Sequence, residues 1–287
     1  MITQGTSAPR VAIAFGGGGA RGLAHIHIIE ALDELGIRPV RITGSSIGAI
    51  MGAGMAAGLS GAEIRDFTLK TVGDPRAVMN RIWSLRPTTL QEFVSGGGFR
   101  VGQYNLERIL KAFLPESLPE DFSGLNIPLG VIATDYYGER EVLIEQGALY
   151  PAMAASAAIP AVFMPVMVEG RVMVDGGIYN PVPFDYLFDD ADIVIGVDVV
   201  GAPVGAPVGE DQQIPRRIES LFGASQLMMQ SIIAAKLKIR KPDILLRPNV
   251  GKIAVLDFMK AADILAMSAD IKDELKRSLD AANTFRA

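Results

Sequence analysis

Two short patterns bring together residue types that could carry out acyl-transfer chemistry. The first is Gly44-Ser45-Ser46-Ile47-Gly48, a G-x-S-x-G pattern. Between a strand and a helix, this pattern places its central serine on a sharp turn with the hydroxyl exposed. An apolar run at 39–43 and a small-residue helical stretch at 46–59 supply that context. We therefore predict Ser46 as a nucleophile rather than only a helix N-cap, and we expect Ser45 to pack.

A serine nucleophile needs a group that accepts its proton. The sequence holds two histidines, His25 and His27. Both precede Ser46, whereas the histidine of an α/β-hydrolase follows its serine, so structural roles are expected for both. Asp175 ends an apolar stretch and is followed by Gly176-Gly177, a tight-turn signal, so it is the preferred base. Two other aspartates that lie in or after apolar stretches stay open as alternatives, Asp135 and Asp198.

The second pattern is a glycine-rich segment, Gly16–Gly22, between a predicted strand and a predicted helix. Free N–H groups at a helix N-terminus attract negative charge, so this loop is expected to bind an anion, a phosphate or the oxyanion of a transition state. Gly17, Gly19 and Gly22 also fit the dinucleotide pattern G-x-G-x-x-G. That pattern requires a carboxylate at the end of the second strand, and its absence here disfavours a nucleotide site.

Composition excludes several other classes of site. The chain of 287 residues has a net charge of −5, which argues against a nucleic-acid-binding protein. It has no cysteine, so disulfides, thiolate nucleophiles and cysteine-ligated metals are excluded. Two histidines disfavour a histidine-rich metal site. An apolar content of 49% with 21% charged residues is typical of a globular protein.

Short β-rich runs alternate with helical patterns, which predicts a three-layer α/β/α sandwich with a largely parallel central sheet. One domain over 1–287 is expected, with a core at about 10–200 and a C-terminal helical extension at about 215–283. The predicted strands are 10–15, 39–43, 128–134, 140–145, 162–168, 171–174, 193–199 and 243–247. The predicted helices are 20–35, 46–59, 62–71, 104–113, 216–239 and 257–279.

Two uncharged stretches, 42–62 and 147–168, are long enough to span a bilayer. Prolines interrupt the second and glycines fill the first, so a cytoplasmic protein is expected, with surface contact to membranes as a further option. The helix at 216–239 combines methionines with a basic end; a core position is preferred, and a membrane-facing or homodimer-forming role is the alternative. The irregular segment at 74–102 is a candidate lid.

Together, these motifs resemble the patatin-like phospholipase family, in order and in spacing. The matching residues are Gly17–Gly22, Gly44–Gly48 and Asp175-Gly176-Gly177, with further landmarks at 133–135, 155–160, 180–183 and 242–248. Gly16, His27 and Met164 stand where the family often has Asp, Gly and Pro, and none of them touches the Ser46–Asp175 dyad. The resemblance covers about 10–279. It implies a patatin-like fold and a Ser–Asp lipid acyl hydrolase of the phospholipase A, lysophospholipase or carboxylesterase type, with no metal or cofactor.

The resemblance also implies roles for individual residues. Ser46 attacks an ester carbonyl of a lipid or other fatty-acyl substrate while Asp175 accepts its proton. The oxyanion is held by backbone N–H groups of Gly17, Gly18, Gly19 and Ile47. Arg21 either supports this loop or meets a phosphate headgroup. An acyltransferase and a catalytically weak lipid-binding module are the alternative functions.

Overall fold

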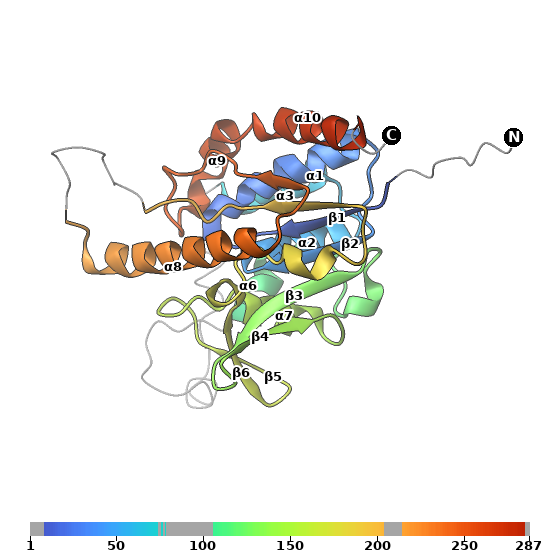
Figure 1. Ribbon diagram of the computed structural model, residues 1–287. Coiled ribbons are helices and arrows are strands. Elements are labelled where there is room, and N and C mark those ends of the chain that lie inside the picture. Colours follow the sequence, from blue (N-terminus) through green and yellow to red (C-terminus); the bar gives the residue numbers. More distant parts are fainter. Residues whose placement is uncertain (1–8, 74–75, 77, 79–105, 204–213, 285–287) are drawn as a thin grey trace, which may run out of the picture.

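The computed structural model describes residues 9–73, 76, 78, 106–203 and 214–284 (Figure 1). Apart from residues 76 and 78, the predicted lid at 74–102 lies outside this range. Eight strands of the described chain form one sheet in the order β5-β6-β3-β2-β1-β7-β8, and β4 pairs with β3. The strands are β1 (Val11–Phe15), β2 (Arg41–Ser45), β3 (Leu129–Asp135), β4 (Arg140–Ile144), β5 (Val166–Val168), β6 (Arg171–Asp175), β7 (Ile193–Val197) and β8 (Ile244–Leu246).

Strands β3, β2, β1, β7 and β8 run parallel, whereas β4, β5 and β6 form an antiparallel wing. Both β1 and β7 are buried along their whole length, as expected for short aliphatic runs covered on both faces. The α-helices are α1 (His25–Glu34), α2 (Ile47–Ala56), α3 (Gly61–Val72), α6 (Leu106–Phe113), α7 (Leu149–Ser156), α8 (Arg217–Ile239), α9 (Ala261–Met267) and α10 (Ile271–Thr284). The predicted largely parallel α/β/α sandwich is confirmed.

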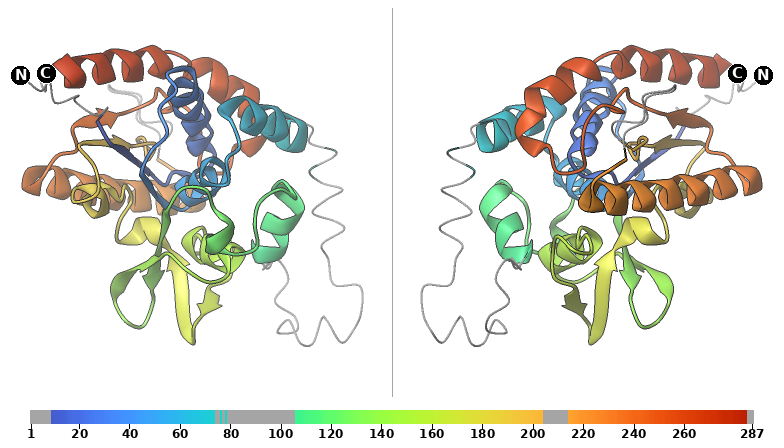
Figure 2. Two further views of the ribbon diagram at one scale, coloured as in Figure 1. Left: turned by 90° about the vertical axis from the view of Figure 1, so that its right-hand side faces the viewer. Right: turned by 90° about the vertical axis from the view of Figure 1, so that its left-hand side faces the viewer.

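Helices cover both faces of the sheet (Figures 1 and 2). The larger hydrophobic core lies between the sheet and α1, α2, α7 and α10, with Phe15 and Ile42 contributed by the strands. The smaller core lies on the opposite face, where Ala12 and Ala14 of β1 cluster with Ile233 of α8 and with Phe184 of the 3-10 turn Phe184–Leu187. In the described part of the chain, no helix combines the length and the apolar character needed to cross a bilayer.

Several predicted boundaries shift in the structure. The predicted helix at 20–35 begins as a 3-10 turn, Gly19–Ala24, and continues as α1. The predicted strand at 162–168 is shorter, since only Val166–Val168 pairs with β6. The single helix predicted at 257–279 is wrong: the chain forms a 3-10 turn, then α9, and then α10 after a break. Helix α7 is not among the predicted elements. Its Pro151 lies in the first helical turn, where a proline costs no hydrogen bond.

Strand β3 brings two distant segments to one point. It pairs with β2 through residues 129–132, with β6 through 133–135, and with β4 through 131–135. Since β4 overlaps both of the others, β2 and β6 must share the opposite edge of β3. The last pairs are Ser45 with Ile132 and Asp175 with Ala133, on consecutive residues of β3. The two strands therefore meet end to end, and whatever follows β2 lies beside the end of β6.

Candidate active site

Ser46 lies at the turn between β2 and α2, in the strained geometry of a nucleophile elbow. Its φ is 55° and its ψ is −126°, a region that residues other than glycine rarely adopt. The turn is tight because α2 begins against the end of β1. A Cβ on Gly48 would lie 2.1 Å from the Phe15 carbonyl oxygen, so only glycine fits there. The Ser46 side chain is buried at the head of the helix.

Asp175 is the last residue of β6, and its carboxylate reaches the serine directly. Ser46 Oγ donates a hydrogen bond of 2.6 Å to Asp175 Oδ2. The other carboxylate oxygen, Oδ1, accepts the Gly177 N–H at 2.7 Å, which fixes the plane of the carboxylate. Burial raises the pKa of Asp175 from 3.8 to about 6, against the hydrogen bonds from Ser46 and Gly177 that lower it. This raised pKa makes the carboxylate a better proton acceptor than an exposed aspartate.

Backbone N–H groups of the glycine loop and of the start of α2 are the candidates for binding an oxyanion. Within the described residues, the N–H groups of Gly18, Gly19 and Ile47 have no hydrogen-bond acceptor, so they are free to bind an oxyanion. Gly17 is a correction to the prediction: its N–H donates to the Pro181 carbonyl at 2.9 Å and is not available. Gly17 instead packs against Ser46, since a Cβ on it would lie 3.2 Å from the serine Cβ.

The other motif glycines lie around the same centre. Three of them allow close approach of backbone or side chain: Gly22 to Ile47, Gly44 to Ala49, and Gly176 to Ile132. At Gly19 both the backbone and the space require glycine, because its φ is +60° and a Cβ would lie 2.2 Å from the Val255 carbonyl oxygen. The glycine loop is therefore wedged between the elbow and the C-terminal part of the chain.

Both histidines are buried and stand away from the Ser46–Asp175 pair. His25 Nε2 donates to the Gly16 carbonyl at 2.9 Å, and its ring packs edge-on against Phe15. Burial lowers the pKa of His25 to about 4, so the ring is neutral at pH 7 and braces the glycine loop. His27 Nε2 donates to the Leu265 carbonyl at 2.7 Å, which ties α1 to α9.

The alternative aspartates have local partners. Asp135 accepts the Gly138 N–H at 2.9 Å, within the turn after β3. Asp198 accepts the Val200 N–H and is paired with Arg247 at 3.0 Å. Neither carboxylate is hydrogen-bonded to Ser46, which favours Asp175 as the base. In the described ranges, no three His, Asp or Glu side chains gather as a metal site would require.

Arg21 is buried, with only 1% of its surface exposed, and its guanidinium donates hydrogen bonds to backbone carbonyls of the same chain. Nε donates to the Ile253 carbonyl at 2.7 Å, and Nη1 donates to the Val200 carbonyl. Burial lowers its pKa to about 10, so it remains charged at pH 7. These contacts support the interpretation that Arg21 holds the glycine loop against the end of β7, and they leave it no room for a headgroup.

Ser156, at the end of α7, is a member of the site that sequence reasoning did not assign a role. Its Oγ accepts the Ser46 N–H at 2.8 Å, and the residue is fully buried. The Ser46 N–H lies at the strained turn, outside the hydrogen bonding of β2 and α2, and this bond gives it an acceptor. The only signal in the sequence was that Ser156 lies within one of the family-like landmarks.

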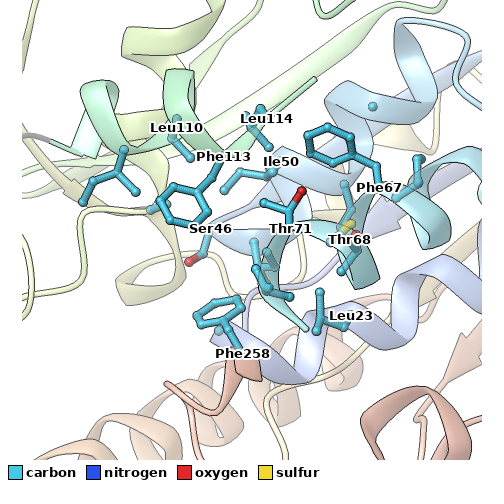
Figure 3. Close-up of a pocket in the computed structure, with 18 of the residues that line it drawn as sticks. Leu23, Ser46, Ile50, Phe67, Thr68, Thr71, Leu110, Phe113, Leu114 and Phe258 are labelled. Carbon is cyan, nitrogen blue, oxygen red and sulfur yellow. The ribbon is translucent and has the colours of Figure 1, made fainter. Parts of the chain in front are cut away.

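An apolar cavity of about 350 Å³ opens at Ser46 (Figure 3). Its described walls come from α2, α3, α6 and the turn before α9, and Figure 3 shows Leu110, Phe113 and Phe258 pointing into it. Polar side chains on the wall are Ser46, Thr68 and Thr71. No charged side chain lines it among the described residues. Such a wall suits a hydrocarbon chain bound next to the serine.

A family model described as patatin-like phospholipase matches residues 13–188. The chain belongs to the patatin-like phospholipase family. The matched segment of this patatin-like domain includes the glycine loop, the elbow and Asp175, and it ends before α8.

Similar proteins include two named relatives and one solved structure. An uncharacterized NTE family protein of Mycobacterium tuberculosis is 36% identical over 71% of this chain and 53% of its own length. The rat patatin-like phospholipase domain-containing protein 7 is 32% identical over 66% of this chain and 13% of its own length. The crystal structure of VipD from Legionella pneumophila has 15% identity and a TM-score of 0.46, covering 92% of this chain and 66% of that chain. The chain thus spans about half the length of the mycobacterial relative.

Proposed function

We propose that this protein is a serine lipid acyl hydrolase of the phospholipase A, lysophospholipase or carboxylesterase type, with Ser46 and Asp175 as its catalytic dyad. The observation that carries the proposal is the 2.6 Å hydrogen bond from Ser46 Oγ to Asp175 Oδ2 at an apolar cavity. A serine on a strained elbow, a buried base and free N–H donors are the groups that ester hydrolysis requires.

In the proposed reaction, Ser46 Oγ attacks the ester carbonyl carbon and its proton passes to Asp175 Oδ2. The resulting oxyanion accepts hydrogen bonds from the N–H groups of Gly18, Gly19 and Ile47, and one such donor is typically worth about 2.7–4 kcal/mol. As the ester C–O bond breaks, Asp175 returns the proton to the leaving alcohol. Water then attacks the acyl-enzyme, giving its proton to Asp175, and the acid leaves as Ser46 regains its proton.

The cavity supports a fatty-acyl substrate. Burying a methylene group in an apolar site is worth about 0.8 kcal/mol, so each added carbon strengthens binding by about fourfold until the cavity is full. The walls offer no cation to hold a charged group in the described part of the chain. We therefore propose that the acyl chain occupies the cavity and that the alcohol part of the ester leaves on the other side of Ser46.

The test is hydrolysis of p-nitrophenyl esters of increasing chain length by the full chain. We expect kcat/KM to rise with chain length, and we expect Ser46→Ala and Asp175→Asn to remove activity while circular dichroism stays unchanged. Ser45→Ala is a matched control, because the neighbouring serine is equally buried and its Oγ has no partner in the described chain. Full activity in Ser46→Ala, or a loss that is equal in Ser45→Ala, would refute the dyad.

A further inference from the structure

The N-terminal part of α8 projects beyond the sheet on the side where the active site lies. Gln226 Nε2 donates to the Val200 carbonyl, just after β7, and Met229 contacts Gly177, just after β6. Farther along, Lys236 Nζ donates to the Val182 carbonyl. The helix therefore runs back along the sheet from the ends of β6 and β7. Residues 217–225 precede these contacts and make up about 13.5 Å of helix at about 1.5 Å per residue. Figure 1 shows this end of α8 projecting beyond the sheet.

Large apolar side chains are exposed to solvent on this end of α8, just before it and in the turn that follows it, and we call them the α8 tip patch. Its members and their exposed fractions are Ile214 (95%), Ile218 (63%), Leu221 (47%), Leu227 (61%) and Met228 (61%). The helix is held by its other side, where Gly223, Gln226 and Ile233 are buried. A cluster of exposed apolar side chains on one projecting element marks a surface for interaction rather than for the protein's own core.

The charges beside the patch identify its occupant. Arg216 and Arg217 lie among the apolar residues and are exposed. In the ranges that the structure describes, neither guanidinium forms an ion pair. Within residues 214–228, which the structure describes, the one carboxylate is Glu219, and it accepts the Arg216 backbone N–H as a helix cap. The described residues 214–228 carry two arginines and one glutamate, an excess of one positive charge, whereas the whole chain has a net charge of −5.

We propose that the α8 tip patch docks on an anionic lipid surface. Apolar side chains enter the boundary between headgroups and acyl chains, while the two arginines remain at the level of the lipid phosphates. A second copy of the chain fits less well, because it would bring two more unpaired arginines into the same interface. Docking at this end turns the side of the sheet that holds Ser46 toward the bilayer. The inference rests on the proposed hydrolysis of lipid esters.

The test measures binding apart from catalysis. Full-length Ser46→Ala protein, which leaves the lipid intact, is sedimented with vesicles of phosphatidylcholine alone or mixed with phosphatidylglycerol. We expect binding to the mixed vesicles that falls as salt is raised. Arg216→Gln combined with Arg217→Gln should weaken it about 30-fold, at about a fivefold effect for each basic residue. Ile218→Ser combined with Leu221→Ser should weaken it about 100-fold or more.

Matched controls lie at the other end of the same helix. Lys238→Gln combined with Lys241→Gln, and Ile239→Ser (86% exposed), remove two basic groups and one apolar group away from the tip. These variants should bind vesicles like the parent. In a chain with Ser46 intact, the tip substitutions should leave hydrolysis of soluble p-nitrophenyl butyrate unchanged. If no variant, nor the parent, hydrolyses this ester, the result counts against the proposed function and not against docking.

Three results would overturn the docking proposal. The first is a lack of binding to both kinds of vesicle. The second is binding that the tip variants retain, or that the controls at the far end lose equally. The third is a dimer in analytical ultracentrifugation that the tip substitutions dissociate without altering vesicle binding, which would assign the patch to a second copy of the chain.

Discussion

Replacing Asp175 by Asn should remove activity and at the same time stabilise the fold. The asparagine has the same shape: its oxygen can accept the Gly177 N–H, and its NH₂ group can donate to Ser46 Oγ. What it removes is a buried charge. The pKa of Asp175 is about 6 in the folded chain against 3.8 for an ordinary aspartate, and at about 1.4 kcal/mol per pH unit this difference corresponds to about 3 kcal/mol.

The sign of the effect follows from proton binding. Between pH 3.8 and about 6 the folded chain holds a proton that the unfolded chain has released, so the wild type loses stability as the pH rises through this window. The asparagine variant has no such loss. Its advantage should therefore be near zero at pH 3.8 and reach about 3 kcal/mol above pH 6.

The assay is urea unfolding of both proteins at several pH values, with the free energy of unfolding extrapolated to water. Asp135→Asn is the matched control, because this buried aspartate also ends a strand but lies outside the dyad. It should keep esterase activity, and it should lose stability because it weakens the pairing with Arg140. A stability difference between Asp175→Asn and wild type that does not change with pH would refute the reasoning.

Three further predictions concern the same site. The kcat/KM of the wild type should rise with pH and level off above an apparent pKa of about 6, as Asp175 ionises; undiminished activity at pH 4 would contradict this. Ser156→Ala leaves the Ser46 N–H buried without a partner, which should lower the free energy of unfolding by about 1–3 kcal/mol in urea unfolding; kcat should fall with little change in KM, because the elbow is held less firmly. Gly19→Ala should lower both activity and melting temperature, because its Cβ would meet the Val255 carbonyl at 2.2 Å; calorimetry and the ester assay test it.

The parts of the fold that sequence reasoning predicted are those with local signals. The run of aliphatic residues in β7 predicted a buried strand, and the turn between β2 and α2 was predicted from flanking glycines around Ser46. Helix α8 was predicted to within one residue, since its pattern is long and is bounded by Pro215 and Pro242. Each of these depends only on neighbours in the sequence.

The parts that sequence reasoning missed depend on partners far along the chain. The helix predicted at 257–279 breaks after Met267 without glycine or proline. There the Leu265 carbonyl receives the ring of His27, 238 residues away, in place of a continuing helical hydrogen bond. Gly17 was expected to be an oxyanion donor, but Pro181 occupies its N–H. No pattern in the neighbouring sequence predicts either contact.

The end-to-end meeting of β2 and β6 on β3 also determines when, during synthesis, the candidate active site can form. Ser46 and Asp175, its proposed proton acceptor, are 129 residues apart, and pairing with β3 brings their strands together. If Ser46 and Asp175 form the proposed dyad, a nascent chain that ends before residue 175 has the nucleophile but no base, and its serine is inert. Activity then requires the long-range pairing that folding forms at the highest entropic cost. For the proposed hydrolase, the fraction of active sites would thus report directly on the fraction of globally folded molecules, and a partly folded chain would pose no chemical hazard to the lipids around it.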